Sequence, residues 1–163
     1  MARVECSTMG KLLGWLVQHT GALMPHEGTN VPVSIEVWTE PGSAAVFKRR
    51  EYLFKGRKPF TFRSKMQLDP SGNLAEYVGG GFGMYLRVHA LEGNLHFEDG
   101  GYFVDILGIR FPIPGLLSPG RVLLKHEDIG KDEFAISIEI THPWFGLLYF
   151  QQGRFRHDLP LSA

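Results

Sequence analysis

The sequence predicts a mainly β protein of the α+β kind: a long antiparallel β-meander that curls into a barrel or half-barrel and packs on one N-terminal amphipathic helix. From Val33 to Phe155 apolar and polar residues alternate, which is typical of strands buried on one face. Gly, Pro, Asp or Asn interrupt this alternation at short intervals, and the links are too short for the crossovers that parallel strands need. An open sheet of that many twisted strands tends to close on itself.

Residues 8–21 are predicted to form the helix. Ser7 or Thr8 can cap its N-terminus, and Gly21 with Pro25 ends it. Its apolar residues fall at helical spacing and form one stripe: Met9, Leu12, Leu13, Leu16 and Val17. We expect this stripe to cover one opening of the curved sheet. The short run just before the helix, residues 3–6, could be a strand, but its pattern is too brief to decide.

Nine or ten strands are expected between residues 31 and 156. The clearest alternation covers residues 60–68, and residues 45–54 should fold back on the preceding strand as a hairpin. Three consecutive glycines at 79–81 indicate a corner between two strands. Residues 99–101, Asp-Gly-Gly, predict a tight reversal. Pro112 and Pro114 restrict residues 112–120 to a loop or a sheet edge.

Size and composition predict one soluble domain over residues 1–163. Lys and Arg total 17 and so do Asp and Glu, so no global charge attracts nucleic acid, and no nucleic-acid partner is expected. A single cysteine, Cys6, excludes an internal disulfide and fits a reducing compartment, so we expect a cytoplasmic protein. No secretory leader pattern and no apolar run long enough to cross a bilayer is present in the sequence.

Short motifs spread along the chain resemble those of a known family. They are Phe47-Lys48-Arg49, Phe62-Arg63-Ser64, Glu76-Tyr77-Val78-Gly79, Pro114-Gly115-Leu116-Leu117-Ser118-Pro119, and Pro143-Trp144-Phe145-Gly146-Leu147-Leu148 followed by Gly153. In their order and spacing, residues 7–159 resemble a bacterial family catalogued as domain of unknown function 4166. The Tyr-x-Gly that the family carries near its end is Gln151-Gln152-Gly153 here. The resemblance implies no particular chemistry; in some relatives the domain follows a dehydrogenase-like one, which implies an accessory role.

A cluster of basic residues lies on two consecutive predicted strands, within the hairpin 48–65. Its main members are Lys48, Arg49, Arg50, Arg63 and Lys65. Interleaved with aromatic residues, such a patch could contact an anionic or acidic partner. The alternative is that these residues form the solvated face of strands near an edge, where Lys and Arg suppress aggregation.

Glu76 is the weak candidate for a catalytic acid or base. It shares a face with Leu74 and Val78, so burial could raise its pKa. The structural alternative is a buried carboxylate paired with a basic residue on a neighbouring strand, such as Arg49. No His, Cys, Asp or Glu spacing predicts a metal site, and residues 79–83 lead into a strand where a phosphate loop needs a helix. No metal and no cofactor are therefore expected.

The preferred functional hypothesis is a non-enzymatic binding module that holds a lipid-like or other hydrophobic small molecule in the curved sheet. The side chains expected to point into the groove are Phe60, Phe62, Met66, Phe82, Met84, Leu86, Phe134, Ile136 and Ile138. The same side chains could instead fill a dry core. The first alternative is an accessory interaction or regulatory domain with a partner protein at the basic hairpin, and the second is an enzyme that uses Glu76.

Overall fold

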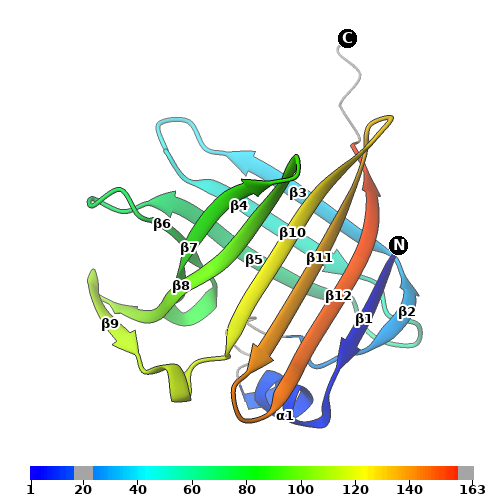
Figure 1. Cartoon of the computed structure of the whole chain (residues 1–163), viewed down its shortest axis with the longest axis horizontal. Helices are drawn as coiled ribbons and strands as arrows, with labels where there is room; N and C mark the ends of the chain where they lie inside the picture. The colour runs from blue at the N-terminus through cyan, green and yellow to red at the C-terminus, as the bar shows by residue number, and fades with distance from the viewer. Residues whose placement is uncertain (17–23, 158–163) are drawn as a thin grey trace.

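The computed structural model describes residues 1–16 and 24–157, and within them nearly the whole chain is β-strand (Figure 1). The strands and the helix are β1 (Ala2–Cys6), α1 (Thr8–Leu16), β2 (Gly28–Val31), β3 (Val33–Thr39), β4 (Val46–Tyr52), β5 (Phe60–Leu68), β6 (Leu74–Tyr77), β7 (Phe82–Leu91), β8 (Asn94–Ile106), β9 (Ile109–Ile113), β10 (Arg121–Gly130), β11 (Glu133–His142) and β12 (Gly146–Arg156). Two 3-10 turns interrupt them, η2 (Gly79–Gly81) and η3 (Gly115–Leu117).

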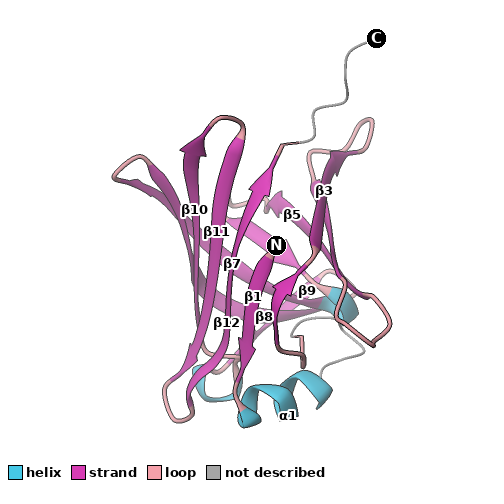
Figure 2. Cartoon of the chain, turned by 90° about the vertical axis from the view of Figure 1, so that its right-hand side faces the viewer, coloured by secondary structure: helices cyan, strands magenta, loops and turns pink. Residues whose placement is uncertain are grey.

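The strands form one antiparallel sheet that is nearly closed into a barrel. Its order is β2-β1-β12-β11-β10-β8-β7-β6-β5-β4-β3, with β9 paired to β8 beside this path. The two ends of the sheet, β2 and β3, are separated by Pro32 alone, whose carbonyl accepts a hydrogen bond from the Leu53 amide at 3.0 Å. The bent segment therefore borders β1 on one side and β4 on the other, and the predicted curled meander is confirmed (Figures 1 and 2).

The prediction that the strands begin at residue 31 was too restrictive. β1 lies near the N-terminus and pairs with both β12 and β2. Its inward residues Ala2 and Val4 are each only 2% exposed. Five residues are too few to identify a strand by alternation; here two neighbours from distant parts of the chain stabilise it.

The N-terminal helix lies across the lower end of the barrel (Figure 2). The structure describes α1 as far as Leu16, and the predicted continuation over residues 17–21 lies outside the described residues. The Ser7 hydroxyl accepts a hydrogen bond from the Gly10 amide at 3.1 Å and caps the first turn, as expected. Met9 and Leu13 pack against the core, but Leu12 is 51% exposed, so the buried stripe is narrower than predicted.

The predictions for two glycine-rich segments had different outcomes. The corner expected at 79–81 is confirmed: η2 joins β6 to β7, and Gly80 and Gly81 have φ of 69° and 79°. The reversal expected at 99–101 is wrong, because β8 runs through it and the register with β7 shifts there instead. Gly101, with φ of 112°, accommodates this β-bulge without turning the chain.

The segment with two prolines behaves as an edge. β9 contains Pro112, and in the part of the chain that the structure describes it pairs with β8 only. A proline on a strand with one neighbour leaves no ladder bond unmade. η3 then leads into β10, and both β9 and η3 contribute side chains to the lower end of the barrel interior.

Candidate functional site

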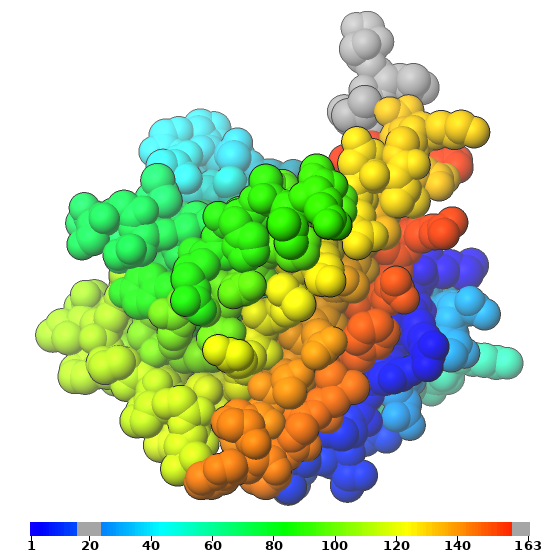
Figure 3. All heavy atoms as spheres, viewed as in Figure 1, coloured from blue at the N-terminus to red at the C-terminus, as the bar shows by residue number. Residues whose placement is uncertain are grey.

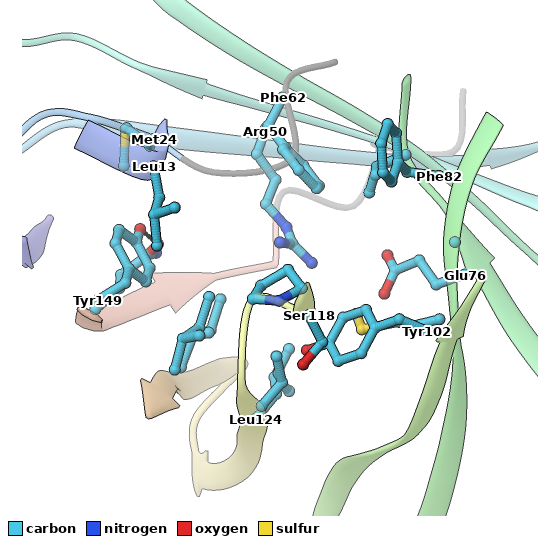
Figure 4. A pocket seen from close by; sticks show the side chains of 18 of the residues that line it. Leu13, Met24, Arg50, Phe62, Glu76, Phe82, Tyr102, Ser118, Leu124 and Tyr149 are labelled. Atoms are coloured by element: carbon cyan, nitrogen blue, oxygen red, sulfur yellow. Dashed lines mark hydrogen bonds between the residues drawn. The ribbon is translucent and has the colours of Figure 1, made fainter. Parts of the chain in front are cut away.

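The barrel encloses a cavity of about 230 Å³ at the end covered by α1 (Figure 4). This far exceeds the roughly 10–15 Å³ that one water needs on the same measure. Its walls are predominantly apolar, and the larger contributors are Phe60, Phe62, Phe82, Met84, Leu124 and Ile138. Leu117, which is 76% exposed, also lines it, so the cavity reaches the surface beside η3. The side chains of β7 to β12 form a continuous outer surface in the space-filling view (Figure 3).

The predicted groove residues separate into two groups. Phe60, Phe62, Phe82, Met84 and Ile138 line the cavity. The other four lie elsewhere: Met66, Leu86, Phe134 and Ile136 are outside its lining. Alternation along the strands correctly indicates an inward direction, but it carries no information on the height along the barrel axis.

Phe134 illustrates this point best. It stacks on Phe155 with ring centroids 5.4 Å apart, near the β10–β11 hairpin at the end of the barrel opposite α1 (Figure 1). Ile136 is partly buried and packs against the hydrophobic core, and Leu86 is only 9% exposed. The Met66 sulfur lies 3.7 Å from the Lys48 ammonium.

The basic residues of the hairpin do not form one surface. On β4, Lys48 and Arg50 share the inward face with Tyr52, while Arg49 points outward opposite Arg63 of β5. Lys65 is also on the outer face, with its ammonium 5.0 Å from the centroid of the Tyr77 ring. The interpretation of all five residues as one solvated patch is therefore wrong for Lys48 and Arg50, because consecutive residues of a strand face opposite sides.

Glu76 is buried, at 5% exposure, and its carboxylate is held by two partners on the inner face. The Ser64 hydroxyl donates a hydrogen bond to it at 2.7 Å, and the Lys48 ammonium lies 3.1 Å away. The proposed pairing with Arg49 is wrong: Arg49 lies on the outer face and pairs with Glu36 at 2.6 Å. Neighbouring strands nevertheless supply the basic partner, as the structural interpretation of Glu76 required.

The Glu76 carboxylate remains ionised. Burial raises the pKa of this carboxyl, but Lys48, Arg50 and the Ser64 hydroxyl lower it by more, so the net direction is downward. Acid–base catalysis near neutral pH needs the opposite direction. This geometry therefore favours a structural role for Glu76 at the cavity wall.

Sequence reasoning missed a second polar group in the cavity. The hydroxyls of Tyr52 and Tyr149 both donate to the Gln151 side-chain oxygen, at 2.8 and 2.7 Å. Burial raises the pKa of both tyrosines, so both are neutral at ordinary pH. Gln151, only 1% exposed, stands where the resembling family has Tyr; alternation along 147–155 could have placed it on the inner face beside Tyr149.

Within residues 1–16 and 24–157, no group of three or more His, Cys, Asp or Glu side chains is arranged to hold a metal ion. No helix in the same residues is long and apolar enough to cross a bilayer. The apolar cavity at the α1 end is the candidate site among the described residues.

Comparisons with known proteins support the family resemblance. The model of a family described as domain of unknown function (DUF4166) matches residues 1–155. An uncharacterized protein, YndH of Bacillus subtilis (strain 168), is 26% identical over 138 residues, which cover 80% of this chain and 67% of that protein. No solved structure matches the chain significantly.

Proposed function

This chain belongs to the family described as domain of unknown function DUF4166, and we propose that it is a non-enzymatic binding module that holds a hydrophobic small molecule inside its β-barrel. The observation that carries the proposal is the cavity of about 230 Å³ with a predominantly apolar wall. A core that served stability alone would be packed to the density of an organic crystal, with few voids larger than a water.

The lining explains how such a ligand would be held. Aromatic and branched side chains from both walls of the barrel face one another across the cavity (Figure 4). Each buried methylene of a ligand contributes about 0.8 kcal/mol, so an alkyl chain of moderate length offsets the entropy lost on association. The opening beside Leu117 gives the ligand a route to the interior.

A neutral fluorescent dye tests the proposal. N-phenyl-naphthylamine should bind the purified protein with saturable fluorescence enhancement. Leu124→Trp, which fills the cavity, should abolish the enhancement. The matched control is Leu123→Trp on the opposite face of β10, which should leave it intact. The absence of saturable binding to wild type, or equal loss in both variants, would contradict the proposal. Native mass spectrometry of protein purified from its own host should find a retained small molecule.

A second candidate function has its own observation. On the outer face, Arg49 and Arg63 lie directly opposite each other across β4 and β5. Glu36 already pairs with Arg49 at 2.6 Å, so an acidic partner would add a counter-charge chiefly at Arg63. The stacked rings of Trp38 and Phe47, with centroids 5.7 Å apart, lie beside them. An accessory interaction domain of this kind would lose its partner protein on Arg49→Glu with Arg63→Glu, and retain it on Arg154→Glu of β12. Co-purification measures this. The expected cytoplasmic location stays a prediction.

A further inference from the structure

We infer that the ligand of this cavity is an amphipathic anion, a carboxylate with an alkyl chain, whose carboxylate pairs with Arg50 while the chain lies against the apolar wall. The inference rests on the proposed function and narrows it from hydrophobic molecules in general to one class. Its starting point is the position of one guanidinium group.

The Arg50 side chain points into the cavity (Figure 4). Strand register places Arg50 opposite Phe62 of β5 and Ile35 of β3, on the inner face. Its guanidinium lies 5.3 Å from the centroid of the Phe62 ring, which orients the group without neutralising it. Transfer of a charge into such surroundings is costly unless a counter-charge is present.

The carboxylates on the inner face do not form a direct ion pair with Arg50. The Arg50 charge helps to lower the pKa of Glu76, but the two groups are more than 4.0 Å apart. Glu76 is committed to Lys48 and Ser64. Asp99 of β8 accepts the Val122 amide at 2.8 Å and lies outside the cavity lining. In the part of the chain that the structure describes, no carboxylate lies within 4.0 Å of the Arg50 guanidinium, whereas Lys48 has one at 3.1 Å.

The other polar groups near Arg50 are neutral. The Tyr52 hydroxyl lies near the guanidinium and donates to Gln151, which also accepts from Tyr149. Across the cavity, the Tyr102 hydroxyl donates to the Gly120 carbonyl at 2.6 Å and the Ser118 hydroxyl to the Gly115 carbonyl at 2.7 Å. Their donor protons are already used, so Arg50 is the charged donor that faces the cavity.

The pairing of one cation with an apolar chamber defines the ligand. A guanidinium presents a planar fork that matches a carboxylate. Beyond it the wall consists of side chains such as Leu124, Ile138 and Ile140, which accept an alkyl chain and offer no partner to a second charge. A neutral hydrophobe would leave Arg50 without an ion-pair partner, and a small hydrophilic anion would leave the wall uncovered.

Displacement of the neutral dye tests this inference. On wild type, decanoate should displace the dye at concentrations about tenfold or more below those of decanol, which has the same chain without the charge. Decyltrimethylammonium should be the weakest competitor. On Arg50→Met, decanoate should lose about tenfold in affinity, whereas decanol should change by less than about threefold. Arg50→Lys keeps the charge without the fork and should fall between wild type and Arg50→Met.

The control variant is Arg154→Met on the outer face of β12, which should match wild type for every competitor. Circular dichroism and dye binding of Arg50→Met establish that the barrel and its cavity persist. If decanol competes as well as decanoate on wild type, or if Arg50→Met weakens both equally, the inference is overturned while the proposed function stands. If wild type binds no dye at all, both fall together.

Discussion

Two half-buried arginines on opposite faces of the same sheet have different surroundings. Arg110 of β9 lies on the outer face, where its guanidinium donates to the Asp69 carboxylate and the Tyr85 hydroxyl, both at 3.0 Å, and to the Tyr77 hydroxyl. The Phe103 ring centroid lies 5.1 Å away. Arg50, on the inner face, lies beside the Phe62 ring and near the neutral Tyr52 hydroxyl. No carboxylate among the described residues lies within 4.0 Å of its guanidinium.

The difference teaches what each region is for. The hydrogen bond to Tyr85, with the further contacts around the group, raises the pKa of Arg110, so its charge is stabilised by the chain itself. The contacts of Arg110 with Asp69, Tyr85 and Tyr77 therefore hold β9 against the neighbouring part of the sheet. On the inner face Arg50 has no carboxylate within 4.0 Å among the described residues, and the ligand that we propose would supply one; functional sites commonly retain such groups at a cost in stability.

The largest expected effect comes from breaking the ion pair on the inner face. Lys48→Met leaves the Glu76 carboxylate buried without its cation, which should cost about 3 kcal/mol in the free energy of unfolding. Chemical denaturation measures this. The double variant Lys48→Met with Glu76→Gln removes both charges and should recover most of the loss. A single variant as stable as wild type would show that Glu76 does not depend on Lys48.

The next effect is at the outer cluster. Arg110→Met removes three hydrogen bonds and the cation over three rings, so we expect a loss of about 2 kcal/mol in the free energy of unfolding. Arg154→Met, at an exposed position, should stay within about 0.5 kcal/mol of wild type. Equal stability of these two variants would contradict the structural role of Arg110.

Arg50→Met completes the comparison with a smaller effect of opposite sign. Removing a cation that lacks a carboxylate partner should leave the free energy of unfolding within about 0.5 kcal/mol of wild type or raise it by up to about 1 kcal/mol. Thermal unfolding of protein freed of any ligand is the measurement. A loss as large as that of Arg110→Met would mean that Arg50 is a structural residue, and the contrast between the two arginines would disappear.

The smallest effect is a pH dependence. Because the folded state lowers the pKa of Glu76, the ionised carboxylate stabilises the fold above its unfolded pKa of about 4.3, and that contribution is lost as the pH falls through the lower folded value. Wild type should therefore exceed Glu76→Gln in stability at about pH 6, and the gap should shrink at about pH 3. A gap that widens on acidification would refute the assigned direction.

Much of the fold followed from local pattern. Residues 60–68 alternate so clearly that β5 has the predicted bounds, and the three glycines at 79–81 form the expected corner. β1 and the bulge at Gly100 and Gly101 did not follow. A five-residue strand depends on partners far along the chain, and the same glycines that allow a turn also allow a bulge when both flanking segments keep a partner strand.

The sequence predicted which side chains of the candidate site point into the barrel, but not which residues meet there. Alternation correctly turned Phe62 and Met84 inward, since it depends only on the two-residue period of a strand. The same alternation places Arg50 and Arg49 on opposite faces of β4, but the sequence-based prediction treated the basic cluster as one surface. The partnership of Tyr52, Tyr149 and Gln151 joins β4 to β12, residues about a hundred positions apart, and no local pattern reports such a contact.

The sequence by itself determined that this chain forms an antiparallel meander with one apolar face, because strand period and turn chemistry act over a few residues. The tertiary structure alone decided where that face stays open and which charges face each other inside. Closure through β1 and the bent β2–β3 segment sets the width and height of the chamber. That closure also placed Lys48 against Glu76 and left Arg50 facing the cavity.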